Sequence, residues 1–142
     1  MSVQQSETIK LDLPASHKHL NILSTCIEAL MVHVEGIADR ELVIYNAQLA
    51  AHEACTNIVD HAYPDQPEGR IAITLTLDYQ QRQLIVDLRD TGQGFDLSSM
   101  PMPDLNQAQE HGYGLFLIHN LMDEVTYTSA PGDNHWRLVK YL

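Results

Sequence analysis

Two runs of alternating residues in the middle of the chain constrain its fold most strongly. Apolar residues occupy every second position over 71–77 and again over 84–88, and the polar segment 79–82 separates the two runs. This pattern predicts a β-hairpin. With 142 residues, 44% of them hydrophobic, the chain is long enough for one ordinary core and too short for two, so we expect a single domain over 1–142.

One strand and two helices are predicted before the hairpin. Residues 8–13 alternate as an opening strand, and apolar residues at helical spacing predict a helix from about 16 to 35 that Ser16 caps. A second helix is expected from Asp39 to about 63. One stripe of this helix consists mostly of small residues, which would let it lie close to a sheet or another helix: Ala47, Ala50, Ala54 and Ile58.

The part of the chain after the hairpin begins with a predicted loop. Residues 92–112 are rich in prolines, amides and acids, and so long a loop in a compact domain is typical of a lid or binding loop. Helical spacing resumes over 115–121, and strands are expected near 125–127 and 136–141 with a turn at 131–134. The predicted order is β, α, α, β, β, lid, α, β, β.

The charge of the chain argues against two classes of partner. Its formal net charge of -11 opposes sequence-independent attraction to nucleic acid or to an anionic membrane, because phosphate binding relies on clustered Lys and Arg. A protein or a nucleotide is the expected partner. An acidic surface also serves solubility alone, so the charge does not by itself indicate a function.

Targeting and metal-binding patterns are missing from the sequence. The first ten residues lack a basic segment followed by an apolar one, and no apolar run approaches the roughly 20 residues that span a bilayer, so we expect a cytoplasmic protein. Cys26 and Cys55 lie among apolar residues in predicted helices, and we assign them neither a disulfide nor a catalytic role. The histidines and cysteines do not have zinc-site spacing, so no structural metal is expected.

The first of three polar clusters lies on the second predicted helix. Glu53 and Asn57 stand four residues apart and share a face, which Asp60 and His61 extend by another turn. Such residues also form the solvated side of an ordinary helix. In a functional site, the Asn57 amide oxygen would ligate Mg²⁺, and Glu53 would orient or deprotonate a nucleophilic hydroxyl or water.

The other two clusters combine glycines with the ends of predicted elements. Asp90 ends the second hairpin strand, and a carboxylate suits the exocyclic amine of adenine, while Gly92 and Gly94 let the backbone approach a flat base. Ordinary turns use the same residues. Gly112 and Gly114 precede a helix whose first N–H groups could bind phosphate, although glycines before a helix are also common in plain loops.

Taken in order, the three clusters resemble the N, G1 and G2 boxes of the GHKL ATPases, in segments 53–63, 90–96 and 112–125. More narrowly, nearly the whole chain resembles the bacterial anti-sigma-factor serine/threonine kinases of partner-switching systems. The resemblance implies an α/β fold, a two-layer α/β sandwich of Bergerat type. Its sheet would be mixed but mostly antiparallel, with helices on one face and a lid at about 95–111.

The resemblance also assigns roles to single residues. It implies that Glu53 is the catalytic base, Asn57 the Mg²⁺ ligand and Asp90 the residue that reads adenine. The other residues that it places at the nucleotide are Asp60, His61, Gly92, Gly94, Phe95, His111, Gly112, Tyr113, Gly114 and Leu115.

The partners and cofactors follow from the same resemblance. Members of this family use ATP and Mg²⁺, bind a sigma factor in one state, and phosphorylate a Ser or Thr of a STAS-domain anti-anti-sigma protein in the other. Many of them are homodimers. The target here would be a sigma factor or another regulator.

One departure from the family pattern leaves other functions open. No Lys or Arg lies between Arg89 and Arg137, so the predicted lid brings no cation to the phosphates, whereas phosphoryl transfer depends on neutralising their charge. A nucleotide-gated binding module with little or no kinase activity is therefore an alternative. A plain ATPase without a protein acceptor is a third.

Overall fold

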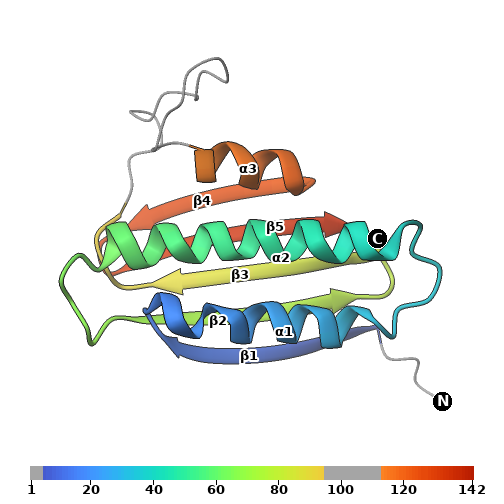
Figure 1. The fold of residues 1–142 in the computed structure, drawn as a ribbon, viewed down its shortest axis with the longest axis horizontal. Coiled ribbons are helices and arrows are strands. Elements are labelled where there is room, and N and C mark those ends of the chain that lie inside the picture. The colour runs from blue at the N-terminus through green and yellow to red at the C-terminus, as the bar shows by residue number, and fades with distance from the viewer. Residues whose placement is uncertain (1–4, 95–112) are drawn as a thin grey trace.

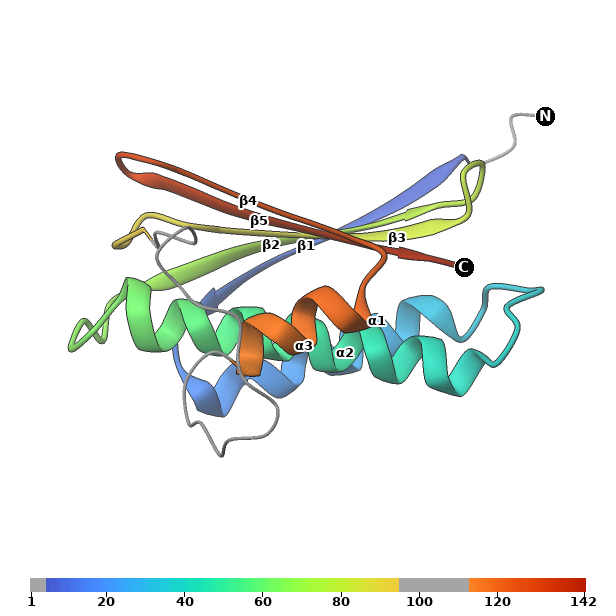
Figure 2. The same ribbon diagram turned by 90° about the horizontal axis from the view of Figure 1, so that it is seen from above.

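The computed structural model describes residues 5–94 and 113–142, which form a two-layer α/β sandwich (Figure 1). Figure 2 shows the helices together on one face of a five-stranded sheet, as predicted. The strands are β1 (Ser6–Pro14), β2 (Arg70–Asp78), β3 (Gln83–Asp90), β4 (Glu124–Ala130) and β5 (Asp133–Tyr141). The α-helices are α1 (Leu20–Met31), α2 (Arg40–Asn57) and α3 (Tyr113–Leu121).

The sheet has the order β1-β2-β3-β5-β4, and each neighbouring pair is antiparallel. The described sheet is thus antiparallel rather than mixed, which corrects one detail of the expected fold. The reason lies in the connections. A single crossover helix makes two strands parallel, but α1 and α2 together return the chain to the end of the sheet where β1 stopped, so β2 runs back beside β1 (Figure 1).

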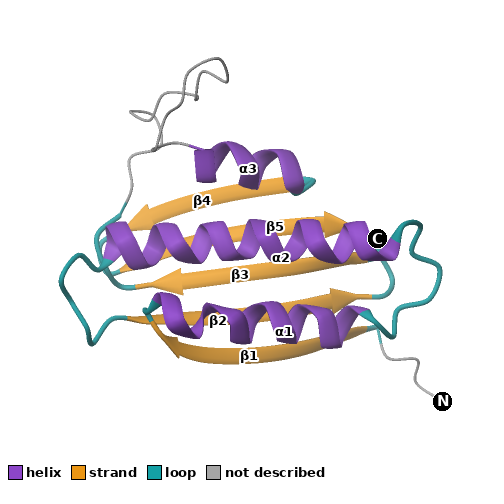
Figure 3. Ribbon diagram, viewed as in Figure 1, coloured by secondary structure: helices purple, strands orange, loops and turns teal. Residues whose placement is uncertain are grey.

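The core lies between the sheet and the helices. The alternating positions of the predicted hairpin face inward and are buried, from Ile71 to Leu77 on β2 and from Leu84 to Leu88 on β3. On the helix side, Ala47, Ala50 and Ala54 are fully buried, as the small-residue stripe predicted. These short side chains let α2 lie in the middle of the helical layer, flanked by α1 and α3 (Figure 3).

The first helix is shorter than predicted. A 3-10 turn at His17–His19 precedes α1, and the side chain of Ser16 makes no capping hydrogen bond. The helix ends at Met31 instead of 35, because the guanidinium of Arg40 donates to the C=O groups of Met31 (2.8 Å) and Val32 (3.3 Å). The C=O of Met31 also accepts from the N–H of Val34 (3.2 Å), so one tighter turn and the guanidinium from α2 together satisfy the end of the helix.

The turn between β4 and β5 is also shorter than predicted. Two residues, Pro131 and Gly132, suffice to connect the strands, and Gly132 has a positive φ (72°). Asp133 and Asn134, expected in the turn, instead begin β5, where Asn134 lies opposite Asp90 of β3. This places a polar side chain at an inward position of the sheet.

Part of the predicted site lies outside the described residues. This holds for the expected lid at 95–111 and for Phe95, His111 and Gly112. Among the described helices, none combines the length and the apolar character that crossing a lipid bilayer requires.

The position of α2 can be tested by filling the space that its alanines leave. Ala50 is fully buried, so Ala50→Leu is expected to overpack the core and to lower the free energy of unfolding by about 1–3 kcal/mol, measured by urea denaturation. His52→Leu places the same side chain on the exposed face of α2 and is expected to change stability by less than about 0.5 kcal/mol. Equal stabilities of the two variants would contradict this packing.

Candidate functional site

The predicted clusters meet at one end of the sandwich. The C-terminal ends of β3 and α2 and the N-terminal end of α3 lie on the same side of the molecule (Figure 1). Gly114 on α3 packs directly against the N-box residues of α2: a Cβ placed there would be 2.9 Å from Glu53 Oε2 and 3.7 Å from Asn57 Oδ1. A larger residue at 114 would therefore meet the Glu53 carboxylate, which would have to move aside.

Asp90 has a buried carboxylate with one oxygen left over. The residue is 3% exposed, and its Oδ1 accepts hydrogen bonds from Asn134 Nδ2 (2.8 Å) and from the N–H of Gly92 (3.0 Å). Its Oδ2 is buried without a hydrogen-bond partner among the described residues. Because an unpaired buried acceptor is costly, a ligand that donates a hydrogen bond to Oδ2 would be favoured.

The protonation of Asp90 reflects this environment. Burial raises the pKa of its carboxyl above the ordinary value, and the nearby charge of Asp133 adds to the increase. The hydrogen bonds from Asn134 and Gly92 act in the opposite direction and lower the pKa, but burial is the larger effect.

The glycines after β3 fit the loop against the protein itself. A Cβ at Gly92 would be 2.3 Å from the carbonyl oxygen of Ala62, and one at Gly94 would be 2.1 Å from Ser129 Oγ. The N–H of Gln93 also donates to the C=O of Ala62 (2.8 Å). These glycines therefore allow close packing on the π-helix Ile58–Ala62, which follows α2, and on β4, in addition to the access to a base that the sequence suggested.

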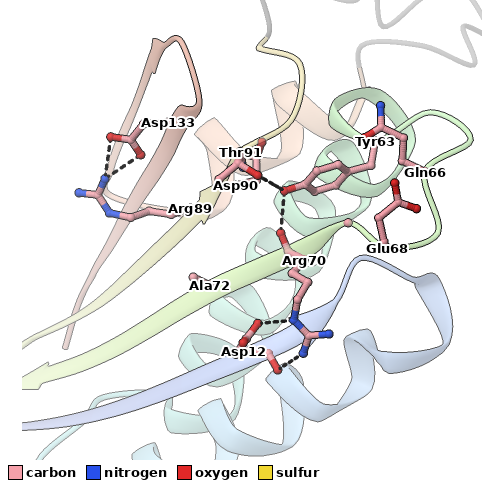
Figure 4. Close-up of a pocket in the computed structure, with 11 residues that line it drawn as sticks. Asp12, Tyr63, Gln66, Glu68, Arg70, Ala72, Arg89, Asp90, Thr91 and Asp133 are labelled. Carbon is pink, nitrogen blue, oxygen red and sulfur yellow. Dashed lines mark hydrogen bonds and ion pairs between the residues drawn. The ribbon is translucent and has the colours of Figure 1, made fainter.

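Tyr63 joins the end of α2 to this loop. Its hydroxyl accepts from the N–H of Thr91 (2.9 Å) and donates to the C=O of Arg70 (2.9 Å), as Figure 4 shows. Its ring covers Gly69, where a Cβ would lie 2.4 Å from a ring carbon. Sequence reasoning used Tyr63 to mark a helix end and as the last residue of the first motif, and it missed this role.

Asn134 was also missed, because it was assigned to a turn. It is 1% exposed, and its Nδ2 donates to the C=O of Gly92 (2.9 Å) as well as to Asp90. The sequence does contain a signal: Asn134 shares the inward face of β5 with the buried residues Trp136 and Leu138.

Asp60 does not extend the face of Glu53 and Asn57 as the sequence predicted. After α2 the chain continues into a π-helix at Ile58–Ala62, whose wider turn directs the residue three positions after Asn57 to another side. The carboxylate of Asp60 lies instead beside His17 Nε2 (2.8 Å), near the start of α1, and both side chains are about half exposed. His61 is exposed.

The remaining predicted residues and groups are placed as follows. Tyr113 begins α3, and Leu115 is partly buried against the core. Burial raises the pKa of the Cys55 thiol to about 12, so this cysteine is a poor nucleophile.

In residues 5–94 and 113–142, no group of three or more His, Cys, Asp and Glu side chains could hold a metal ion.

A cavity of about 580 Å³ adjoins the same end of the sheet (Figure 4). Arg70 and Arg89 line it and are paired with Asp12 (2.8 Å) and Asp133 (3.0 Å). Arg89 alternates along β3 with inward residues, so the cavity lies largely on the face that the helices do not cover. Asp90, Thr91 and Tyr63 connect this face to the helical side.

Comparison with known proteins agrees with this geometry. Residues 13–140 match the histidine kinase-like ATPase domain family. The chain belongs to this family. The predicted family and fold are thereby confirmed, and a histidine kinase-like ATPase domain implies the use of a nucleotide.

Among curated proteins, several bacterial serine-protein kinases have sequences similar to this chain. Serine-protein kinase RsbW of Halalkalibacterium halodurans is 36% identical over 93% of this chain and 82% of its own length. Serine-protein kinase RsbW of Bacillus cereus strain G9842 is 33% identical over 92% of this chain and 82% of its own length.

Solved structures share the fold of this ATPase domain. The RsbU and RsbW domains of a Mycobacterium tuberculosis protein superpose with a TM-score of 0.68 at 17% identity, covering 96% of this chain and 32% of that one. The histidine kinase domain of a blue-light activated kinase from Erythrobacter litoralis superposes with a TM-score of 0.58 at 16% identity, covering 100% and 66%.

The role of Tyr63 can be tested with Tyr63→Phe, which keeps the ring over Gly69 and removes the hydroxyl. The N–H of Thr91 then loses its acceptor, so we expect its amide hydrogen exchange to accelerate and the free energy of unfolding to fall by about 1–3 kcal/mol. Tyr79→Phe removes a hydroxyl that donates to Glu7 (2.9 Å) elsewhere and should leave exchange at Thr91 unchanged. Unaltered exchange at Thr91 in Tyr63→Phe would show that the contact does not hold the loop.

The buried charge of Asp90 is expected to lower the stability of the ligand-free protein while it contributes to ATP binding. Because its pKa is raised, the folded state binds a proton more tightly than the unfolded state, and the free energy of unfolding falls as pH rises from the ordinary pKa through the raised one. We therefore expect Asp90→Asn to raise the melting temperature of the ligand-free protein at neutral pH while weakening ATP binding. The stability difference should shrink below about pH 4.

The matched control is Asp12→Asn, which removes an exposed carboxylate paired with Arg70. Its melting temperature should stay close to that of the wild type at both pH values. A less stable Asp90→Asn at neutral pH would contradict the assigned cost of the buried charge.

Proposed function

We propose that this protein is an ATP-dependent serine/threonine protein kinase of the partner-switching type. It phosphorylates a STAS-domain anti-anti-sigma protein and sequesters a sigma factor or a similar regulator. The observation that carries the proposal is the contact of Gly114 with Glu53 and Asn57 at the same end of the sandwich as Asp90, whose buried Oδ2 has no donor among the described residues. The relatives named serine-protein kinase RsbW support it.

In this proposal, Asp90 is the residue that recognises adenine. Its free Oδ2 would accept a hydrogen bond from the 6-amino group of adenine, which removes the cost of leaving that oxygen unpaired. The first N–H groups of α3, around Gly114, would bind phosphate oxygens at the positive end of the helix dipole. The two contacts would fix the nucleotide at its base and at its phosphates.

Asn57 would hold Mg²⁺ through its amide oxygen. This donor fits the ion, because Mg²⁺ prefers oxygen ligands and is usually completed by phosphate and water, so one protein oxygen is enough. When bound, the ion would neutralise charge on the phosphates. Glu53, one helical turn before Asn57, would accept the proton of the partner's Ser or Thr hydroxyl, whose oxygen bonds to the terminal phosphorus of ATP as the bond from that phosphorus to ADP breaks.

The remaining parts of the proposal concern the protein as a whole. The chain acts as a single ATPase domain in the cytoplasm, where ATP and transcription regulators are found. Its net charge of -11 suits protein partners and disfavours direct contact with nucleic acid or anionic membrane. A homodimer, as in many relatives, is part of the proposal.

The distribution of cations favours a second candidate, a nucleotide-gated binding module with little kinase activity. Of the eight Lys and Arg residues, all except Lys10 and Lys18 are held by carboxylates or backbone carbonyls of the described chain: Arg40, Arg70, Arg82, Arg89, Arg137 and Lys140. None lies between Arg89 and Arg137 in the sequence. Charge on the transferred phosphoryl group would then depend on backbone N–H groups, Mg²⁺ or the partner.

Transfer of labelled phosphate from ATP to the cognate STAS-domain protein, in the presence of Mg²⁺, tests the kinase. We expect phosphoserine or phosphothreonine with the wild type, and a rate about 10²–10⁴-fold lower with Glu53→Gln, because the general base is lost. ATP affinity should change little. Glu41→Gln, at the other end of α2, is the control and should retain the wild-type rate.

The same assay separates the two candidates. Confirmed ATP binding without any transfer to the STAS protein would rule out the kinase, and partner binding that survives Glu53→Gln would then support the binding module. Transfer by Glu53→Gln within tenfold of the wild-type rate would remove Glu53 from the mechanism.

A further inference from the structure

We propose that Asn134 is a positioning residue that makes the nucleotide site selective for a purine carrying a 6-amino group. It would act through Asp90 and not through contact with the base. This inference rests on the proposed function, since it needs a nucleotide beside Asp90. It concerns a residue that belongs to none of the three sequence clusters.

The hydrogen bonds of Asn134 determine how its side chain is oriented. Its Nδ2 donates to two acceptors, Asp90 Oδ1 (2.8 Å) and the C=O of Gly92 (2.9 Å). Its Oδ1 accepts from the hydroxyl of Ser129 on β4 (2.7 Å). Only the NH₂ group can satisfy the two acceptors, so the amide has a single favourable orientation. Because Asn134 is only 1% exposed, water cannot take the place of these hydrogen-bond partners.

This orientation decides which oxygen of Asp90 is available. Asn134 and the N–H of Gly92 both bind Oδ1, so the carboxylate cannot rotate without breaking two hydrogen bonds. Oδ2 remains as a fixed acceptor at a defined place. Because geometry must be held closely for a hydrogen bond to discriminate between ligands, the fixed carboxylate can tell an amino group from a hydrogen atom or a keto oxygen.

Asn134 also keeps the carboxylate in its acceptor form. Burial alone favours protonated Asp90, and a protonated carboxyl could donate to a 6-keto purine. The hydrogen bond from Asn134 is the larger of the two that oppose this effect. Two properties of Asn134, its geometry and its donor group, therefore favour the same ligand.

The test compares two nucleotides by isothermal titration calorimetry at neutral pH. ATP has the 6-amino group, and purine riboside triphosphate has a hydrogen atom in its place. The variants are Asn134→Leu, which has a similar size and no donor, and Asn134→Ala, which fits any space that asparagine occupies. Asn120→Ala is the control, because it removes an exposed asparagine near the end of α3, where its side chain donates to the C=O of Phe116 (2.8 Å).

The wild type and Asn120→Ala should bind ATP about 10- to 100-fold more tightly than purine riboside triphosphate, as expected for one hydrogen bond to a carboxylate. In both Asn134 variants this ratio should fall to about threefold or less, while affinity for purine riboside triphosphate changes little. That pattern is a loss of selectivity and not a loss of the site.

Other results would overturn the inference in distinguishable ways. A wild-type ratio retained in folded Asn134→Ala would show that Asn134 does not set selectivity. An equal loss of both nucleotides would make it a residue of general structural importance. A wild type that binds neither nucleotide would refute the proposed function itself, and one that binds both equally would refute only the role of Asp90.

Discussion

The close approach of α2 to the sheet is the constraint on which the rest of the structure depends. Ala47, Ala50, Ala51 and Ala54 are fully buried, and their small side chains let the helix lie in the middle of the helical layer. A stripe of larger residues would lift α2 away from the sheet. The position of α2 also determines where Glu53 and Asn57 lie, because both side chains are on the side of α2 that contacts Gly114 of α3.

A buried polar network at the end of the sheet complements that packing. Ser129, Asn134 and Asp90 connect three neighbouring strands, and Tyr63 attaches the end of α2 to the loop that follows β3. Such networks hold a single geometry well when their members are satisfied. In the part of the chain that the structure describes, Asp90 Oδ2 has no donor, so a ligand that donates a hydrogen bond there would remove the cost of an unpaired acceptor.

Local patterns predicted the hairpin, the alanine stripe and the three polar clusters, because each depends on residues a few positions apart. Contacts between distant residues explain what was missed. Asn134 meets Asp90 across 44 positions, Tyr63 meets Thr91 across 28, and Asp60 turns to His17 across 43. The antiparallel sheet has a similar explanation, since strand direction depends on how many helices lie between strands and not on any residue in them.

The internal pairing of the arginines has a consequence for how fast ligands arrive. With most cations bound to the protein's own acceptors, a net charge of -11 leaves an outer field that is mainly negative. This field repels ATP and attracts basic protein surfaces over roughly the Debye length, about 8 Å at physiological ionic strength. Added salt should therefore speed the association of the nucleotide and slow that of a basic partner, so the two encounters respond in opposite directions to the same ionic change.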